Sequence, residues 1–394
     1  MPNTFVVRHR VFFRKSHGFI GQEAKRMTGE TEEGRGVDLP EPAPSEGARR
    51  GAKLKLVAIV IAILLVGVII WQVWFAVPDR SDWAYEMTQL NEANDRGHTG
   101  EGIRVGIVDT GINPDHRNFN GLTIAKWKDF VNGRSTPYDD QGHGTAMASI
   151  IAGQDALPGG APDVELIIAK VMDSEGSSSD SRVAKGVWFC IDPNGDGDYG
   201  DGADVISMSL GGRTSILSLI IGTESQTAIN EAVSAGILVV AAAGNDGEAD
   251  DGDVATPGRM RNVICVGAVD ENGQIASFSS EGFNPVLLSR DPHKKPEVVA
   301  PGVDIVTADF GGRWATGSGT SQATAFVSAC LAVALSAHPQ LAHEGARGGT
   351  ETAVVTIKQA IMDSSRKEAG QSTPHDDHYG YGLIQTMDLI DALA

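Results

Sequence analysis

The feature that most constrains this chain is a nearly unbroken apolar run, LVAIVIAILLVGVIIWQVWFAV, from Leu56 to Val77. As a helix, 22 residues span roughly 33 Å at about 1.5 Å per residue, enough for the hydrocarbon core of a bilayer. We therefore expect a transmembrane helix over residues 54–77. A buried core helix and a cleaved signal peptide are the alternatives, and the 55 residues that precede the run disfavour a signal peptide.

The charges that flank this run predict its orientation. The residues just before it are basic: Arg49, Arg50, Lys53 and Lys55. Asp79, Arg80 and Asp82 follow it. The positive-inside tendency places the N-terminus in the cytoplasm and residues 79–394 outside, in a single-pass protein of the cell membrane. Residues 1–53 show little periodicity, so we expect a disordered cytoplasmic tail.

The charge of the chain is uneven. Residues 1–55 carry 11 basic and 7 acidic residues, whereas the remainder carries 21 basic and 44 acidic residues. Nucleic-acid binding needs a basic footprint, so the acidic body excludes nucleic acid as the expected partner. The three cysteines, Cys190, Cys265 and Cys330, lie in apolar stretches, and their odd number and spacing match no disulfide or metal framework. We expect three buried thiols.

From about residue 102, short apolar runs alternate with amphipathic stretches, which is typical of an α/β fold with a mostly parallel sheet. The expected strands are 103–108, 164–171, 204–208, 237–242 and 263–269. The expected helices are 143–152, 181–190, 227–235 and 322–336.

Four polar residues lie at the ends of these elements. Asp109 follows the first strand, His143 opens a helix, Asn245 follows a strand, and Ser321 opens the long helix. In parallel sheets, functional groups gather beyond the C-terminal ends of the strands. The sequence therefore predicts that these side chains meet at one edge of the sheet.

The four residues suit nucleophilic catalysis. A serine hydroxyl needs a base to accept its proton and a third group to orient that base, and Ser321, His143 and Asp109 supply these three roles. Ser321 is expected at a helix start, where backbone N–H groups lack intrahelical partners. Its N–H and the Asn245 side-chain amide would form an oxyanion hole. Each motif alone is a weak signal, and the prediction depends on their conjunction.

The motifs resemble those of the subtilisin-like serine proteases, the subtilases. The matching segments are 108–112 (VDTGI), 143–145 (HGT), 242–245 (AAGN) and 319–323 (GTSQA), in the chain order Asp, His, Ser. Further agreement comes from 207–211, 300–303 and 379–384, and the resemblance covers about residues 85–394. It implies a subtilisin-like three-layer fold and a serine endopeptidase that acts on protein or peptide substrates and needs no cofactor for its chemistry.

The resemblance also implies substrate contacts. The backbone of Ser209, Leu210 and Gly211 would pair with an extended substrate as an added strand. Ala242, Ala243 and Gly244 would line one side of the pocket for the residue before the cleaved bond, together with the oxyanion-hole residue.

Two positions depart from the family pattern. The family commonly has Met after the serine and a second His after HGT, whereas this chain has Gln322 and Ala146. Neither position carries the triad chemistry, so we expect activity. Many members also carry a folding propeptide, but only about 20 residues separate Val77 from the domain start. We expect residues 78–100 to be a linker and the start of the domain, residues 101–394 to be the protease domain, and folding to proceed without that module.

An acidic loop could bind a structural calcium ion. Asp192, Asn194, Asp196 and Asp198 match the first half of an EF-hand loop, but the twelfth position is Ala203 in place of the expected Glu. A calcium site and a solvated acidic turn are therefore both open. We expect a solvated loop for the acidic run 246–253.

Three other functions could be built on this sequence. A catalytically silent binding module on the same fold would not need all four chemical positions to be filled. A calcium-dependent adhesion protein would explain the acidic loops but not the motifs. An intramembrane protease is disfavoured because the apolar run contains no Ser, His or Asp.

Overall fold

The computed structural model describes residues 46–75, 78–211, 223–247, 254–284 and 289–394. These residues fall into two units, the N-terminal helix α1 and the domain that follows Val77. The acidic run 246–253 is described only as far as residue 247, so the loop prediction falls mostly outside the described residues.

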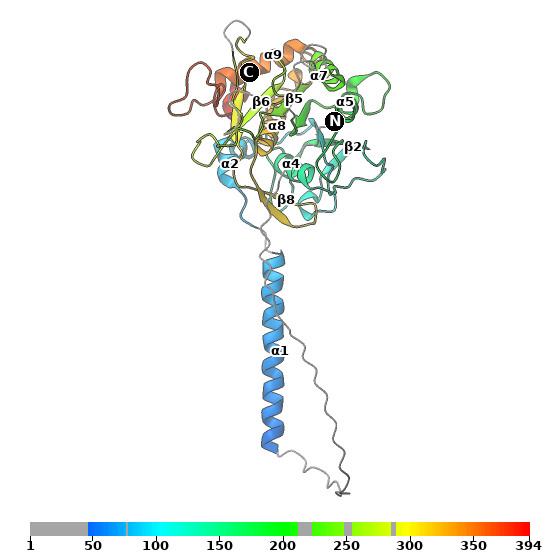
Figure 1. Ribbon diagram of the computed structural model, residues 1–394, viewed down its shortest axis with the longest axis vertical. Helices are drawn as coiled ribbons and strands as arrows, with labels where there is room; N and C mark the ends of the chain where they lie inside the picture. The colour runs from blue at the N-terminus through cyan, green and yellow to red at the C-terminus, as the bar shows by residue number, and fades with distance from the viewer. Residues whose placement is uncertain (1–45, 76–77, 212–222, 248–253, 285–288) are drawn as a thin grey trace, which may run out of the picture. The chain divides into compact units, whose positions relative to one another are not determined.

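Helix α1 is a single helix from Glu46 to Phe75 (Figure 1). It begins eight residues before the predicted span, because its first turns contain good helix formers such as Ala, Arg and Lys. Residues 53–67 of this helix are all exposed. The exposed large hydrophobic residues are Leu54, Leu56, Val57, Ile59, Val60, Ile61, Ile63, Leu64, Leu65 and Val66. Apolar side chains therefore surround the described middle of α1 on every side.

The domain is built on a parallel sheet of seven strands in the order β2-β3-β1-β4-β5-β6-β7. The strands are β1 (Arg104–Asp109), β2 (Thr123–Asp129), β3 (Glu165–Lys170), β4 (Val205–Met208), β5 (Leu238–Ala242), β6 (Ile264–Val269) and β7 (Val298–Pro301). The strands β4 to β7 are buried throughout because helices cover both faces of the sheet. The predicted α/β fold with a mostly parallel sheet is confirmed.

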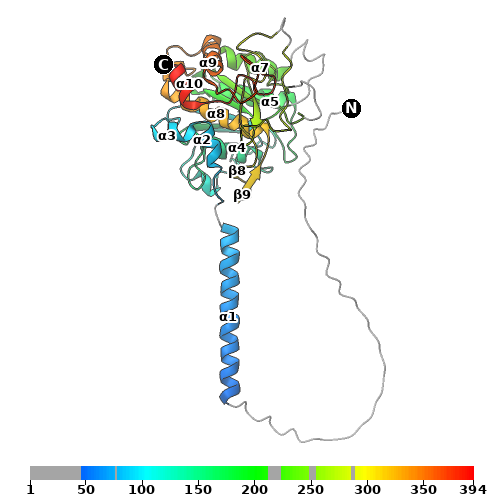
Figure 2. The same cartoon turned by 90° about the vertical axis from the view of Figure 1, so that its left-hand side faces the viewer.

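Two pairs of helices cover the sheet and make a three-layer domain (Figure 2). One pair is α4 (His143–Ala152) and α8 (Thr320–Ala337), and the other is α5 (Asp180–Ile191) and α7 (Glu224–Ser234). Within the part of the chain that the structure describes, α8 has the length and composition of a membrane span, but 83% of it is buried in the domain. It is therefore the core helix on which the sheet packs.

The remaining elements complete the domain. They are α2 (Asp82–Met87), α3 (Leu90–Asp95), η1 (Arg117–Phe119), η2 (Tyr199–Asp201), the antiparallel hairpin β8 (Ile305–Ala308) and β9 (Trp314–Gly317), η3 (Pro339–Leu341), α9 (Glu351–Ser364) and α10 (Thr386–Ala392). The short helices α2 and α3 belong to the domain core, because the Tyr85 ring meets Phe326 edge-on at 4.9 Å and Thr88 accepts a hydrogen bond from Thr386 N at 2.9 Å.

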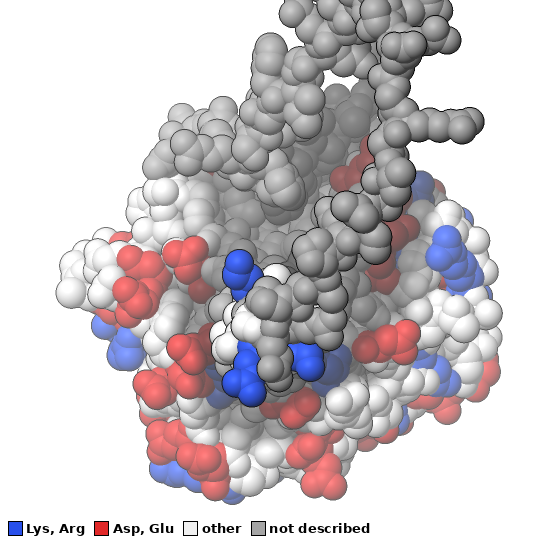
Figure 3. Space-filling view, turned by 90° about the horizontal axis from the view of Figure 1, so that it is seen from below, with Lys and Arg blue, Asp and Glu red and all other residues white. Residues whose placement is uncertain are grey.

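Acidic side chains are spread widely over the face shown in Figure 3, with basic side chains interspersed among them. All three cysteines are buried and free, as expected from their apolar surroundings. Burial raises the pKa of the Cys330 thiol to about 12.

Candidate active site

The structure brings Asp109 and His143 into direct contact. Asp109 is the last residue of β1, and His143 is the first residue of α4. Nδ1 of His143 lies 2.9 Å from both carboxylate oxygens of Asp109, whose side chain is buried. The Asp109 Oδ1 atom also accepts a hydrogen bond from Thr110 N at 2.7 Å. The carboxylate is thus fixed by the turn that follows its own strand.

Glycines allow this approach. A Cβ atom on Gly144 would lie 2.1 Å from the carbonyl oxygen of Gly111, so helix α4 rests directly on the turn after β1. Gly111 has a φ of +117°, and a Cβ there would lie 2.1 Å from Tyr138 O. The glycines of the Asp-Thr-Gly and His-Gly-Thr motifs therefore serve the close packing that brings Asp109 to His143.

The start of α4 is held by polar side chains. Gln141 Oε1 accepts a hydrogen bond from His143 N at 2.8 Å. Asp139 accepts hydrogen bonds from Gly142 N at 2.8 Å and from the Thr145 N–H and hydroxyl at 3.0 and 2.7 Å. These contacts satisfy N–H groups that have no partner inside the helix.

The electrostatics of His143 suit a general base. Burial disfavours the imidazolium, but the charge of Asp109 and its hydrogen bond favour it more, with a smaller contribution from Asp139. The pKa of His143 is therefore raised above its usual value. An imidazolium at this position is therefore stabilised by the neighbouring carboxylate.

Ser321 lies in the first turn of α8, as the sequence predicts. Its hydroxyl donates a hydrogen bond to Ser209 O at 3.2 Å, and the Ser209 hydroxyl donates to Ser321 O at 3.0 Å. The serine is thereby tied to the segment predicted to pair with substrate. No hydrogen bond joins the Ser321 hydroxyl to His143 among the described residues, and catalytic hydrogen bonds are often long or differently aligned in free enzymes.

Asn245 lies beside the start of the same helix. Its Oδ1 atom accepts hydrogen bonds from Thr320 N at 2.9 Å and from the Thr320 hydroxyl at 3.0 Å. Because the oxygen is occupied in this way, the Nδ2 amide is the part of the side chain that is left to donate. Asn245 is exposed, so its amide is accessible to a ligand.

The predicted substrate contacts also lie together. Ser209 to Gly211 extends beyond β4, while Ala242 ends β5 and Ala243 and Gly244 follow it. A Cβ on Gly211 would lie 2.8 Å from the Ala255 Cβ, and one on Gly244 would lie 3.5 Å from it. The two predicted segments therefore approach a common neighbour, Ala255, which no motif in the sequence indicated.

The family follows from comparison with known proteins. Residues 100–382 match the model of the subtilase family. The chain belongs to the subtilase family. It is 36% identical to the serine protease AprX of Bacillus subtilis over 66% of this chain and 63% of that protein. It is 34% identical to a thermostable alkaline protease of Halalkalibacterium halodurans over 74% of this chain and 73% of that protein.

Subtilisin E of Bacillus subtilis is 35% identical to this subtilase over 74% of the present chain and 66% of its own length. The match thus spans less than two thirds of AprX and of subtilisin E.

Three supporting residues of this subtilase were missed in the sequence. Thr320 fixes the Asn245 side chain, and Gln141 holds the backbone of His143. Lys170 is fully buried at the end of β3, where its ammonium donates to Thr110 O and Asp140 Oδ1, both at 2.6 Å. For Lys170 the sequence did carry a signal, because a lysine ends an otherwise apolar strand.

The predicted calcium ligands do not converge on one point. Asp192 Oδ1 and Oδ2 accept hydrogen bonds from Gly195 N and Gly197 N at 2.7 and 2.9 Å, and Asn194 and Asp196 each accept one from a backbone N–H two residues further on. Among the described residues, no group of three or more His, Cys, Asp or Glu side chains could hold a metal ion. The described residues thus show no ready-made cluster of acidic ligands in this loop, and the calcium site stays a prediction.

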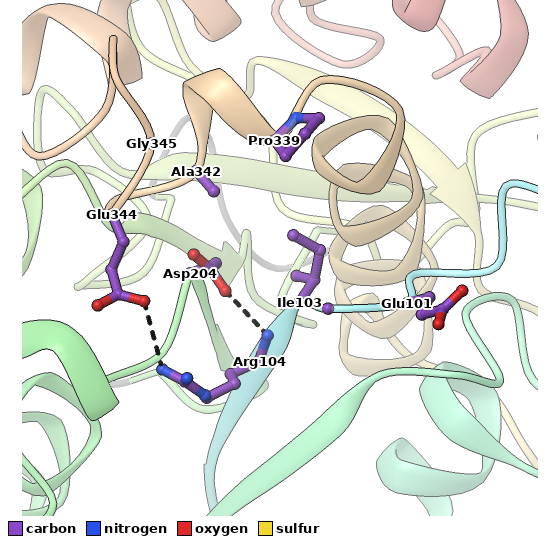
Figure 4. Close-up of a pocket in the computed structure, with 9 residues that line it drawn as sticks. Glu101, Ile103, Arg104, Asp204, Pro339, Ala342, Glu344 and Gly345 are labelled. Atoms are coloured by element: carbon purple, nitrogen blue, oxygen red, sulfur yellow. Dashed lines mark hydrogen bonds and ion pairs between the residues drawn. The ribbon is translucent and has the colours of Figure 1, made fainter.

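A separate cavity of about 230 Å³ lies at the opposite edge of the sheet (Figure 4). Arg104 and Asp204, at the N-terminal ends of β1 and β4, line it together with Glu344. Arg104 N donates to Asp204 Oδ2 at 2.9 Å. Since Asp109 ends the strand that Arg104 begins, this cavity is distinct from the candidate active site.

Proposed function

We propose that this chain is a serine endopeptidase. The observation that carries the proposal is the Asp109–His143 pair, whose atoms approach to 2.9 Å beyond the C-terminal end of β1 in a chain of the subtilase family. Ser321 at the start of α8 supplies the nucleophile, and the relatives named as proteases support the same activity.

In the proposed reaction, Ser321 Oγ attacks the substrate carbonyl while His143 accepts the hydroxyl proton and Asp109 stabilises the resulting imidazolium. The oxyanion of the tetrahedral intermediate accepts hydrogen bonds from Ser321 N and Asn245 Nδ2. His143 then gives its proton to the leaving amine, and the C–N bond breaks. Water then attacks the acyl-enzyme with His143 again as base, the ester C–O bond breaks to release the carboxylic acid product, and His143 returns the proton to Ser321 Oγ.

The proposed substrates are extended segments of proteins. The backbone beyond β4, Ser209 to Gly211, would add the substrate as a strand, and the polypeptide beyond β5 would line the pocket for the residue before the cleaved bond. Leu210 is partly exposed and Gly211 is exposed, which supports a backbone that is open to a ligand.

Labelling of the full-length chain in detergent with a fluorophosphonate tests the activity. We expect labelling of the wild type and none of Ser321→Ala, together with hydrolysis of an unstructured protein by the wild type alone. A folded wild type that binds an extended peptide but neither labels nor cleaves would instead establish the silent binding module.

We further propose that α1 crosses the cell membrane once, with the N-terminus in the cytoplasm and the catalytic domain outside. The exposed apolar side chains around residues 54–66 support a lipid environment, since water would not favour a helix that is apolar on all sides. The basic residues Arg50, Lys53 and Lys55 precede the apolar run that begins at Leu56 and support the orientation.

Two variants with one added cysteine each test this topology, because the three native thiols are buried and should not react. A membrane-impermeant maleimide added to intact cells should label Asp79→Cys and leave Gly47→Cys unlabelled until the cells are lysed. Extraction of the protein by alkaline carbonate, or the opposite labelling pattern, would refute the proposed anchor or its orientation.

A further inference from the structure

Gln322, the residue after the nucleophile, carries an unpaired polar atom. The residue is 8% exposed, and its Oε1 atom has no hydrogen-bond partner among the described residues. A buried carbonyl oxygen without a partner is unfavourable, because it has lost its hydrogen bonds to water. The family commonly has Met at this position, and a thioether carries no such requirement.

The geometry around Gly319 shows what this oxygen faces. A Cβ atom on Gly319 would lie 3.0 Å from Gln322 Oε1 and 3.4 Å from Asn245 Nδ2. Gln322 Oε1 and the Asn245 carboxamide, whose oxygen would lie 3.7 Å away, therefore flank the same point, two residues before the nucleophile, and no hydrogen bond joins them in this structure. A Cβ on Gly317 would lie 2.6 Å from Gln322 Nε2, so the nitrogen end of Gln322 faces the end of β9 instead.

The Nδ2 atom of Asn245 can donate two hydrogen bonds. Thr320 occupies its Oδ1 atom, and Nδ2 carries two N–H groups. An oxyanion in the proposed hole uses one of them. The second is available to an acceptor on the other side, and the substrate oxyanion cannot pair with Gln322 Oε1 itself, because both atoms are acceptors.

We propose that Gln322 is a positioning residue, whose Oε1 accepts the second N–H of Asn245 Nδ2 and so fixes the direction of the first N–H onto the oxyanion. This inference rests on the proposed function. The contact closes when the substrate carbonyl enters the site, as catalytic hydrogen bonds tighten in the complex. It gives this chain a support for its oxyanion donor that Met at the same position does not provide.

A double-mutant cycle on the full-length protein in detergent tests the proposal, with kcat and KM measured on a chromogenic peptide amide. Gln322→Met removes the acceptor and keeps the length of the side chain, and we expect kcat to fall about 3- to 10-fold with KM unchanged. Asn245→Ala should lower kcat about 10²- to 10³-fold. In the double variant, Gln322→Met should cost less than about 2-fold beyond Asn245→Ala, because its partner is absent.

Gln359→Met is the matched control. This glutamine lies on α9 and bonds only along its own helix, to Asp363 at 3.0 Å, so its replacement should leave kcat unchanged. Melting temperatures verify folding, and Gln322→Leu gives a second comparison if Gln322→Met is unstable.

An unchanged kcat in Gln322→Met and Gln322→Leu would overturn the proposal, as would losses that multiply in the double variant. A wild type that neither cleaves nor labels with fluorophosphonate would refute the proposed function itself. An active wild type with a multiplicative cycle would refute the role of Gln322 alone.

Discussion

Both carboxylate oxygens of Asp109 lie 2.9 Å from Nδ1 of His143, and the carboxylate is almost completely removed from water. This contact fixes the imidazole tautomer, because Nδ1 must carry the proton that it donates and Nε2 is left as the acceptor. Burial lowers the pKa of His143, but the contact with Asp109 raises it, and the net shift is upward.

Replacement of Asp109 by Asn should lower kcat about 10³- to 10⁴-fold, because the neutral amide no longer stabilises the imidazolium or the tautomer. The pKa that governs kcat/KM should fall as well, because the main group that raises it is gone. Asp163→Asn, an exposed carboxyl just before β3, is the control and should retain full activity. Equal activity of Asp109→Asn and the wild type would exclude a triad.

The wild type should lose activity at acid pH. His143 must be neutral to accept the serine proton, and its pKa is raised above the usual 6.5. As the pH falls through that raised value, the base becomes protonated and kcat/KM declines, so the half-maximal pH should lie above 6.5. A pH–rate profile on a neutral peptide substrate measures this midpoint. Activity that peaked near pH 4 would contradict a histidine base.

Gly144→Ala should separate α4 from the turn after β1, because the new Cβ would lie 2.1 Å from a backbone oxygen. We expect a loss of about 3 kcal/mol in the free energy of unfolding, from overpacking against a backbone atom. We also expect at least a 100-fold loss in kcat/KM, since small displacements of a catalytic group cost about that much.

The control for this substitution is Gly133→Ala. Gly133 is exposed and has a φ of +71°, and a Cβ there would meet nothing within 4 Å. Its replacement should cost about 1–2 kcal/mol of backbone strain and leave kcat/KM unchanged. Denaturant unfolding and peptide hydrolysis of both variants distinguish a clash at the site from strain in general.

The free energy of unfolding of the domain should rise with pH above neutrality. The cause is a buried cluster of Lys295, Glu297 and Lys358. Glu297 Oε1 accepts hydrogen bonds from Lys358 Nζ at 2.5 Å and from Lys295 Nζ at 2.8 Å, so two ammonium groups share one carboxylate. Burial, together with the charge of Lys295, lowers the pKa of Lys358 to about 7, although Glu297 opposes this shift. Between about pH 7 and the unfolded value of 10.5, the unfolded chain binds more protons than the folded one.

The free energy of unfolding should therefore increase with pH through this window and lose that contribution as the pH falls through 7. Urea titrations at a series of pH values measure the slope. Lys358→Met should flatten it, whereas Lys185→Met, at an exposed position of α5, should leave it unchanged. An unaltered slope in Lys358→Met would assign the pH dependence to other groups.

The three thiols should be unreactive in the folded protein. Burial raises the pKa of Cys190, Cys265 and Cys330, so little thiolate forms and reagents cannot reach the sulfur atoms. A disulfide-exchange reagent should titrate about zero thiols in the native protein and three after denaturation. Rapid titration of one thiol without unfolding would place that cysteine at an accessible surface.

The local patterns of the sequence predicted the central part of the fold well. Buried strands such as β5 and β6 are continuous apolar runs, and α4 and α8 begin at the predicted motifs. The edge strand β2 was missed because its residues are half exposed and charged, TIAKWKD, without a clear apolar pattern. The helices α2 and α3 are too short to show a period, and they are stabilised by packing on the domain.

The sequence by itself determined the identity and order of the candidate triad, because Asp109, His143 and Ser321 stand in local motifs whose glycines and flanking runs are visible in the chain. Only the tertiary structure decided which groups support them. The contacts of Thr320 with Asn245 and of Lys170 with the turn after β1 join segments 75 and 60 residues apart. Such contacts depend on how the strands and helices pack, and packing between distant segments leaves no periodic pattern in the sequence.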